Sequence, residues 1–481
     1  MYFSIKNLII QARNSYRRLV EMNKNSYWKL QMCGTEAEMR EVAARICRNY
    51  LYGAWKTVDP EQLDFRKMSG GLSNFLYYVA LPDDVTKLEC YRREQSPDAE
   101  KKTFPSISSF CMAEPRKVLL RIYGQVHGER AMDAIVTESV IFTLLSERKL
   151  GPKLYGVFSG GRIEEYIPAR SLCHKELSEP AISMKIAEKM AAIHSMDVPL
   201  SKEPNWLWKT TGKWWKTTKE DRWVNTVAKN DEEKRILKIL KSIDFEKELE
   251  WLKKLTDSVE SPIVFCHNDM QEGNILILED TLPNSEDEDY TTSYSDVKSD
   301  KGNDHRLSSN FNALYDDSNT SDDRLSYSSD NGEPRLVLID FEYCAYNHRG
   351  FDIANHFQEW GYEYTNTEYP YYFEHHGYCP TMEHKEIFIK EYLKHYHANL
   401  DKEPPTIDDI NKLFTEVEAF ELASHLFWCL WTTNSSTSQI PFGYWEYALS
   451  RYERYRQLKQ ELIKKDKLGF PQKRKICEVD I

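Results

Sequence analysis

The sequence predicts an α+β protein with two lobes, a small lobe rich in β-strands followed by a larger and mostly helical lobe. Its 481 residues exceed what one small hydrophobic core needs, so two lobes fit the length. Strand-like apolar runs with glycine turns dominate residues 56–170, which predicts the sheet. Helical apolar spacing dominates residues 171–481. Residues 1–55 form an N-terminal helical segment, in which residues 27–55 carry the helical pattern.

The small lobe is predicted to contain a hairpin, a further strand, one helix and a final pair of strands. A glycine pair separates two strand-like runs in residues 65–82, which predicts the hairpin. Residues 86–114 are polar and lack periodicity, so we expect a loop there. A strand over 116–124 and a helix over 133–150 follow. Residues 152–170 then supply two strands and an extended exit toward the helical lobe.

The helical lobe is predicted to hold long helices around a short pair of strands. The helical patterns cover residues 184–196, 231–255, 407–433 and 444–465. Residues 264–278 and 335–347 contain apolar, β-branched runs, and we expect these two stretches to pair. The sequence between them is polar, so we expect it to extend away from the strand pair.

That intervening segment, residues 279–334, concentrates the negative charge of the chain. The formal net charge is −12, and 15 acidic against 4 basic residues lie within the segment, so the remainder is nearly neutral. Rich in Ser, Asp and Asn, it is predicted to be a disordered insertion in a hairpin loop. A merely solvated loop and a loop regulated by phosphorylation, at serines such as Ser326 or Ser328, both stay open. No Lys/Arg cluster indicates a nucleic-acid partner.

Cysteine usage and hydropathy bear on the compartment. The ten cysteines form no CxxC pair and no Cys/His spacing typical of a zinc site, and several lie in apolar runs. We therefore expect a reducing compartment and a cytoplasmic location. No apolar stretch reaches transmembrane length, so we do not expect an integral membrane protein. An N-terminal helix that associates with membrane surfaces stays an alternative.

The stretch VFCHNDMQEGNILIL, residues 264–278, places a polar triplet between two apolar runs. Asp269 in this triplet could act as a base toward a hydroxyl, and Asn274 lies five residues later in the same loop. A second carboxylate, Asp340, ends the apolar run LVLID. An Asp, an Asn five residues on and a strand-terminal Asp are typical of kinases, in which the Asn and second Asp bind Mg²⁺ against the phosphates of ATP. A capped turn is the alternative.

The small lobe should then bind the nucleotide. Ser69 to Asn74, SGGLSN, could bring backbone N–H groups to phosphate oxygens, although an ordinary hairpin turn would also explain the glycines. Arg121, on a strand that is otherwise apolar, is the candidate phosphate-binding cation, and Glu138 is its candidate partner. An exposed edge-strand arginine is the alternative. The extended link EEYIPAR could pair its backbone with an adenine edge.

Five motifs in order, GGLSN, KVLLRIYG, ESVIFTLLSERKLGPKLYG, FCHNDMQEGNIL and IDFEYCAYNHRGFDIANHFQEW, make the chain resemble the choline/ethanolamine kinases, and among them most the choline kinases. The resemblance covers residues 55–451. It implies a protein-kinase-like two-lobe fold and the phosphorylation of choline to phosphocholine by ATP, with Mg²⁺ as cofactor. It also implies a homodimer in the cytoplasm. Asp352 falls where such folds brace the catalytic loop through buried hydrogen bonds, so we expect a structural role for it.

The resemblance also implies roles for individual residues. Asp269 becomes the catalytic base, and Asn274 and Asp340 become the Mg²⁺ ligands. Arg121 and Gln271 would lie toward the phosphates. The phosphate-facing loop would consist of Ser69, Gly70, Gly71, Leu72, Ser73, Asn74 and Phe75, and the hinge of Glu165, Tyr166, Ile167, Pro168, Ala169, Arg170 and Ser171. The sequence departs from the family pattern at Ser69, where Arg is common, at Glu165, where Gln is common, and in the acidic insertion.

Aromatic residues suggest how the acceptor is recognised. A quaternary ammonium has no N–H to donate, so it needs aromatic faces and nearby negative charge. The candidate wall consists of Tyr343, Glu359, Tyr364, Trp428, Trp431 and Tyr447. Tryptophans three residues apart on a helix are also typical of a core. The match to the family's choline pocket favours choline, with ethanolamine as a weaker substrate. A kinase mainly for ethanolamine, an aminoglycoside phosphotransferase and an inactive scaffold stay open.

Overall fold

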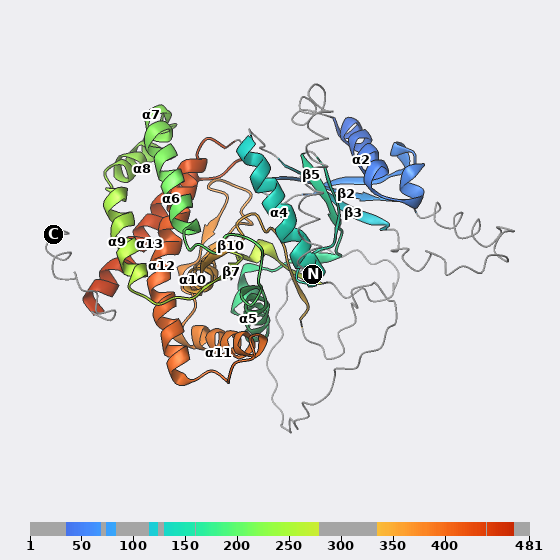
Figure 1. The fold of residues 1–481 in the computed structure, drawn as a ribbon. Helices are drawn as coiled ribbons and strands as arrows, with labels where there is room; N and C mark the ends of the chain where they lie inside the picture. The colour runs from blue at the N-terminus through green and yellow to red at the C-terminus, as the bar shows by residue number, and fades with distance from the viewer. Residues whose placement is uncertain are drawn as a thin grey trace, which may run out of the picture.

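The computed structural model describes residues 35–68, 74–82, 115–123, 129–158, 160–278, 334–438 and 440–465. The predicted phosphate-facing turn from Ser69 to Ser73, the polar loop 86–114 and the acidic insertion lie outside the described residues, apart from position 334. In the described part, the chain folds into a sheet with a flanking helix on one side and a larger assembly of helices on the other (Figure 1).

The small lobe is built on one antiparallel five-stranded sheet with the strand order β1-β2-β3-β5-β4. Its strands are β1 Asp64–Met68, β2 Asn74–Ala80, β3 Lys117–Tyr123, β4 Leu154–Phe158 and β5 Gly161–Glu165. The pairing of β1 with β2 confirms the predicted hairpin. Because β3 lies between β2 and β5, a residue on this strand has neighbours on both sides.

Two helices of the small lobe differ in extent from the predicted ones. Thr35 caps helix α2, Glu36–Tyr50, which ends at Leu51 because the chain becomes extended there; Gly53 then takes a positive φ of 61°. Helix α4, Glu129–Glu147, ends earlier than predicted because Lys149 adopts a left-handed conformation with φ of 57°. Sequence periodicity alone does not reveal such backbone reversals.

The buried side chains form two cores, one in each lobe. Helix α4 connects the small lobe to the core of the helical lobe. One core lies between α2 and the sheet and includes Trp55 and Phe65. The other fills the helical lobe and also takes in Phe142 of α4, whose ring lies 5.7 Å from that of Phe341. Helix α4 follows the sheet in sequence but packs its buried face on the larger core, so it joins the two lobes (Figure 1).

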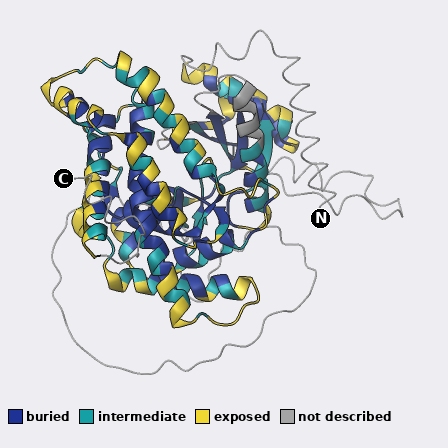
Figure 2. Cartoon of the chain, turned by 60° about the vertical axis from the view of Figure 1, so that its left-hand side comes forward, coloured by how far each residue is buried: buried dark blue, intermediate teal, exposed yellow. Residues whose placement is uncertain are grey.

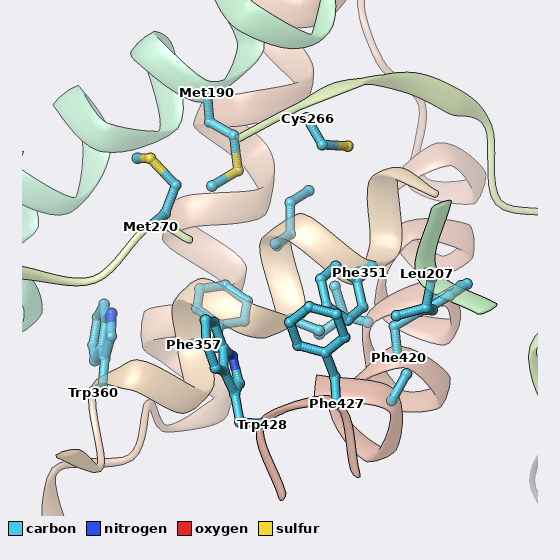
Figure 3. Close-up of a cluster of buried hydrophobic side chains, with 14 of the residues drawn as sticks. Met190, Leu207, Cys266, Met270, Phe351, Phe357, Trp360, Phe420, Phe427 and Trp428 are labelled. Carbon is cyan, nitrogen blue, oxygen red and sulfur yellow. The ribbon is translucent and has the colours of Figure 1, made fainter. Parts of the chain in front are cut away.

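The helical lobe confirms the predicted helices and adds others. Its long helices are α5 Pro180–His194, α6 Trp206–Thr217, α8 Asp231–Lys241, α9 Phe245–Asp257, α10 Arg349–Glu359, α11 Met382–Asn399, α12 Ile407–Ser435 and α13 Tyr444–Lys465. The single helix expected over 231–255 is two helices, because Asp244 caps the start of α9 with its side chain. Several helices of the structure carry buried residues on one side and exposed residues on the other (Figure 2). Every residue of α10 is buried; the Phe351 ring packs on Phe427 of α12, and the Phe357 ring packs on Phe388 of α11 (Figure 3).

Short elements complete the fold. They are the 3₁₀ turns Gly53–Lys56, Pro60–Gln62, His174–Ser178, Glu272–Asn274 and His376–Tyr378, the π-turn Thr218–Arg222, the single turn α7 Trp223–Asn225, and the strands β11 Tyr362–Glu363 and β12 Phe373–Glu374. Among the described residues, we find no helix with the length and apolar character that membrane crossing requires.

The two apolar stretches expected to pair do so in two separate ladders. Strand β7, Ile263–Cys266, pairs with β10, Ala345–His348, while β8, Ile275–Leu278, pairs with β9, Leu336–Leu338. The strand β6, Ala169–Ser171, adds to the other edge of β8. This arrangement brings the loop between β7 and β8 beside the loop between β9 and β10. All the predicted catalytic carboxylates lie in these two loops.

Candidate active site

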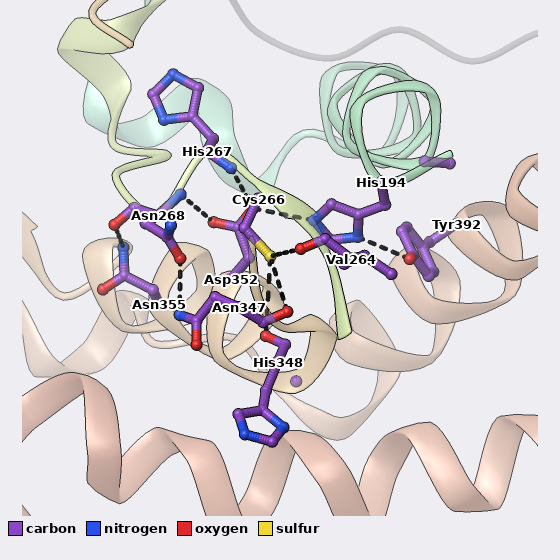
Figure 4. A network of polar contacts seen from close by, with 12 residues as sticks. His194, Val264, Cys266, His267, Asn268, Asn347, His348, Asp352, Asn355 and Tyr392 are labelled. Atoms are coloured by element: carbon purple, nitrogen blue, oxygen red, sulfur yellow. Dashed lines mark hydrogen bonds and ion pairs between the residues drawn. The ribbon is translucent and has the colours of Figure 1, made fainter. Parts of the chain in front are cut away.

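The loop after β7 is held in place by one buried carboxylate. Asp352 of α10 accepts hydrogen bonds from the main-chain N–H groups of His267, at 2.8 Å, and Asn268, at 2.7 Å (Figure 4). Asn268 has a φ of 67°, a conformation that few residues other than glycine adopt without support. The two bonds to Asp352 hold this reversed backbone, which confirms the bracing expected from the sequence.

Further buried groups complete the brace. His194 of α5 contacts Asp352 through Nε2 at 3.0 Å and Tyr392 through Nδ1 at 2.7 Å. Burial alone would raise the pKa of Asp352, but the hydrogen bonds from the His194 ring and from the His267 main-chain N–H hold it below its usual value. The side chain of Asn268 donates to the Tyr343 carbonyl at 2.9 Å. The brace therefore fixes both loops of the site at once.

His267 links the catalytic loop to the end of β9. Its Nε2–H donates to the carbonyl of Ile339 at 3.0 Å, so Nδ1 carries the lone pair and accepts from the main-chain N–H of Asp269 at 3.3 Å. Burial lowers the pKa of His267, which favours this neutral form. A neutral imidazole thus positions the backbone of Asp269 relative to the residue that precedes Asp340.

Asp269 and Asn274 contact each other directly within the loop between β7 and β8. The Asn274 amide donates to the Asp269 main-chain carbonyl and to the carboxylate oxygen Oδ2, both at 2.9 Å. Burial, followed by the negative charges of Glu359, Asp340 and Glu342, raises the pKa of Asp269 well above its usual value. The site is therefore short of positive charge and favours the arrival of a cation. Asn274 could offer the oxygen of its side-chain amide to such a cation.

Asp340 has the properties of a metal ligand. Its φ is 62°, and its Oδ1 is buried without a hydrogen-bond partner among the described residues. Its Oδ2 lies 3.8 Å from the guanidinium of Arg121, which crosses from the sheet of the small lobe. A buried, unpartnered carboxylate oxygen is costly unless a cation binds it. The oxygen donors of Asp340 and Asn274 suit Mg²⁺, so the residues present fit that ion.

The partner expected for Arg121 is wrong. Arg121 donates to Glu164 at 2.8 Å, whereas Glu138 pairs with Arg162. The alternative of an exposed edge arginine is also wrong, because only 3% of Arg121 is exposed and β3 is an interior strand. Arg121 stands opposite Arg162 in the ladder, and both donate to Glu164, which lies between them. Sequence reasoning missed this carboxylate.

The predicted hinge residues form hydrogen bonds, an ion pair and a ring contact with neighbouring residues of the chain. The Glu165 carboxylate accepts from the Lys153 main-chain N–H at 3.0 Å, and Arg170 forms a two-pronged ion pair with Glu176 at 2.8 Å. The ring of Tyr166 lies edge-on to that of Tyr78 at 4.6 Å. These contacts fix the course of the link between β5 and β6. Gln271, expected near the phosphates, uses its carbonyl oxygen to accept from the Gly273 N–H at 2.7 Å.

The predicted aromatic wall divides into buried and half-buried rings. Trp428 is 7% exposed, donates to Asn355 at 2.6 Å and packs in the core, so the core interpretation holds for most of its surface (Figure 3). Trp431, with its ring 5.5 Å from that of Trp428, is half-buried. Tyr343 is also half-buried, with its ring 5.8 Å from that of Trp428. Phe442, whose ring lies 6.5 Å from that of Trp431, extends this group.

The carboxylate of this wall has a partner that the sequence did not reveal. Glu359 forms a buried ion pair with Arg451 of α13 and accepts from the Tyr364 hydroxyl at 2.7 Å. Tyr364 in turn contacts the Tyr447 hydroxyl at 2.7 Å. The guanidinium of Arg451 lies 3.7 Å from the ring centre of Tyr362. The charge of Glu359 is thus compensated within the protein, and it is not an isolated anion facing the acceptor.

Glu272 is a second buried carboxylate in the catalytic loop that sequence reasoning missed. It is 4% exposed and accepts from the Tyr364 main-chain N–H at 3.3 Å, while its Oε2 has no partner among the described residues. Burial, followed by the charge of Glu359, raises the pKa of Glu272 to about 8. The folded protein therefore holds a proton on Glu272 at neutral pH, whereas the unfolded chain releases it.

A pH-dependent stability follows from this buried proton. Because the folded pKa of Glu272 is raised, its ionisation destabilises the fold progressively as pH rises from about 4.5 to about 8, by on the order of a few kcal/mol in total. Glu272→Gln removes this titration, so we expect the variant to lose less stability than the wild type between pH 6 and pH 9. Urea unfolding at both pH values measures the difference. The exposed Glu250→Gln serves as control, and equal pH slopes in all three proteins would contradict the assignment.

Comparison with known proteins shows that the chain is similar to choline and ethanolamine kinases. The family model described as choline/ethanolamine kinase matches residues 65–456. A human choline/ethanolamine kinase is 38% identical over 431 residues, covering 89% of this chain and 87% of that protein. Mouse choline kinase alpha is 34% identical over 452 residues, covering 89% and 82%. A probable ethanolamine kinase A of Dictyostelium discoideum is 27% identical over 446 residues, covering 92% and 99%.

Solved structures support the fold. The crystal structure of a choline kinase from Cryptosporidium parvum aligns with a TM-score of 0.57 at 24% identity, covering 89% of this chain and 97% of that chain. An ethanolamine kinase from Plasmodium vivax aligns with a TM-score of 0.54 at 20% identity, covering 91% and 92%. These alignments extend through both lobes, which confirms the predicted two-lobe α+β class.

Proposed function

Because the chain belongs to the choline/ethanolamine kinase family and has its protein-kinase-like two-lobe fold, we propose that it transfers the terminal phosphoryl group of ATP to choline. The products are phosphocholine and ADP, and ethanolamine is a weaker acceptor. One observation carries the assignment of chemistry. Asp269 and Asn274 contact each other in a loop that a buried carboxylate, Asp352, holds in a reversed backbone conformation.

Asp269 accepts the proton of the acceptor hydroxyl. Its raised pKa makes the carboxylate a stronger proton acceptor than an ordinary aspartate, which suits a general base. Asn274 and His267 hold the residue from two sides, so little reorganisation is needed when the hydroxyl arrives. The hydroxyl oxygen can then attack the phosphorus as the proton moves to Asp269.

Asp340 and Asn274 would hold Mg²⁺, which neutralises phosphate charge when it is bound. The unpartnered Oδ1 of Asp340 supports this assignment. Arg121 would contribute a further positive charge beside the phosphates, held by Glu164 from behind. The contacts of the turn from Ser69 to Phe75, the hinge from Glu165 to Ser171 and Gln271 with the nucleotide stay predictions, as do the homodimer and the cytoplasmic location.

The half-buried rings support choline as the preferred acceptor. Tyr343, Trp431 and Tyr364 present aromatic faces next to a catalytic loop rich in carboxylates. A trimethylated ammonium gains from such faces and needs no hydrogen-bond acceptor, whereas the primary ammonium of ethanolamine does. With the charge of Glu359 compensated by Arg451, recognition falls to the rings and to the carboxylates near Asp269.

ADP release with Mg-ATP and matched concentrations of choline, ethanolamine and an aminoglycoside tests the proposal. We expect kcat/KM for choline to exceed that for ethanolamine by at least about tenfold, which corresponds to the value of one or two cation–π contacts. A preference for ethanolamine would leave the catalytic assignment intact and contradict the argument from the rings. Absence of turnover with every acceptor would favour an inactive scaffold.

Trp431→Leu gives the same test from the side of the protein. Removing this half-buried ring should raise KM for choline by about 3- to 30-fold and leave KM for ATP nearly unchanged. Trp208→Leu is the matched control, because Trp208 is also half-buried but its ring lies against Lys253, at 5.7 Å, on another helix. Equal changes in both Michaelis constants would place Trp431 in the core and not in the acceptor site.

A further inference from the structure

Three side chains far apart in the sequence meet outside the proposed active site. One ring nitrogen of His174, one of His375 and one carboxylate oxygen of Glu363 all lie within 4.8 Å of one another. His174 begins the 3₁₀ turn that follows β6, Glu363 belongs to β11, and His375 directly follows β12. The pairing of β11 with β12 brings Glu363 and His375 together, and the ring of His174 lies 5.0 Å from that of His375.

The side chain of His174 is arranged so that one of its ring nitrogens can bind a cation. It is only 5% exposed, and its Nε2–H donates to the main-chain carbonyl of Trp360. That bond fixes the tautomer, so Nδ1 carries the lone pair. Nδ1 is buried and has no hydrogen-bond partner among the described residues. A histidine that donates one N–H to a backbone carbonyl and keeps the other nitrogen bare has the arrangement of a typical metal ligand.

The other two groups are also suitable ligands. His375 Nε2 lies 2.7 Å from Glu363 Oε2, and the other oxygen of Glu363 accepts from the Thr365 hydroxyl at 2.6 Å. The hydroxyl orients the carboxylate, as outer hydrogen bonds do in metal sites. A cation can replace the proton that His375 and Glu363 share. Two imidazoles and one carboxylate form a set of donors that favours Zn²⁺ over Mg²⁺.

A second cluster of similar composition lacks this property. His194, Cys266 and Asp352 also lie within ligand distance of one another. Both ring nitrogens of His194 are already used, by Tyr392 and Asp352, so no lone pair is left for an ion (Figure 4). The difference between the two clusters is the bare Nδ1 of His174.

We propose that His174, Glu363 and His375 form a binding site for one divalent transition-metal cation of the Zn²⁺ class, separate from the Mg²⁺ ligands Asp340 and Asn274. Three protein ligands leave a fourth position for water or another ligand. Glu363 immediately precedes Tyr364, which contacts Glu359 and Tyr447 in the proposed acceptor site. A bound cation would therefore connect the link between the lobes to the strand next to the acceptor site.

Metal content measures this directly and does not depend on catalysis. Metal-free protein is dialysed against Zn²⁺ in the presence of excess Mg²⁺ and its zinc is quantified, and Co²⁺ loading is followed by visible absorption. We expect one equivalent of Zn²⁺ in the wild type. His375→Ala and Glu363→Gln should weaken binding by at least about tenfold. His376→Ala is the matched control, because the imidazole of His376 is next to His375 in the sequence but is exposed and pairs with Glu374.

Circular dichroism confirms that each variant is folded before its zinc is measured. Glu363 is half-buried. Because glutamine has the same shape as glutamate, Glu363→Gln tests the site even where an alanine variant fails to fold. The proposal is overturned by a wild type that binds less than one equivalent. It is also overturned by His375→Ala and Glu363→Gln proteins that bind Zn²⁺ as tightly as His376→Ala.

Discussion

Asp269→Asn is expected to lower kcat by about 10²- to 10⁴-fold while the protein stays folded and still binds ATP. Asparagine has the same shape as aspartate, and its carbonyl oxygen can still accept the hydrogen bond from the Asn274 amide. The variant therefore keeps the local structure and removes only the ability to accept a proton. It also removes one negative charge from a site where several carboxylates already raise the pKa of Asp269.

The measurement is ADP release at saturating choline and Mg-ATP, with ATP affinity and urea unfolding measured on the same preparation. Asp257→Asn is the control, because it makes the same change at an exposed carboxylate that pairs with Lys253. A kcat within a few-fold of the wild type would remove Asp269 from the role of general base. A parallel loss of stability would instead indicate that the substitution disturbs the loop.

The catalytic loop could be predicted from the sequence because its groups lie close together in the chain. Asp269 and Asn274 are five residues apart, and a polar triplet between two apolar runs marks the loop. Asp340 could be predicted because it ends the apolar run that contains β9. The fold class followed from the change in periodicity between the halves of the chain. Each of these signals is local, and each corresponds to a backbone feature that the structure contains.

Partners across long distances could not be predicted in this way. Glu359 and Arg451 are 92 residues apart, and the helices that carry them show no sign in the sequence that these two charges meet. The partner of Arg121 was missed because strand register decides it, placing Glu164 and Arg162 on the neighbouring strand. Register also decides that the two apolar stretches form two ladders and not one.

Asp352→Asn should have the largest effect on stability, lowering the free energy of unfolding by about 3–5 kcal/mol, because it removes a buried carboxylate that accepts three hydrogen bonds and leaves buried donors unpaired. The carboxylate of Asp352 uses both oxygens, since Oδ1 accepts from Asn268 and Oδ2 from His267 and His194. An asparagine amide offers one acceptor and two donors, so at least one donor would face an N–H group. The reversed backbone at Asn268 would then lose its support.

The pH dependence of this loss has a definite sign. Because the folded pKa of Asp352 is lowered, its carboxylate stabilises the fold above the pKa of the unfolded chain, and this contribution disappears as pH falls through the folded pKa. The difference between wild type and Asp352→Asn, measured by urea unfolding, should therefore shrink below about pH 4. Tyr392→Phe removes only the outer hydrogen bond to His194, so it should cost about 1 kcal/mol.

Comparing this variant with Asp269→Asn separates support of the loop from chemistry. Both variants should lose turnover, but only Asp352→Asn should lose stability together with it, because Asp352 contacts the loop backbone and not the acceptor. A fully stable Asp352→Asn protein with low kcat would contradict the bracing role. Such a result would indicate instead that the charge of Asp352 acts on the reaction through His267, which lies between Asp352 and Asp269.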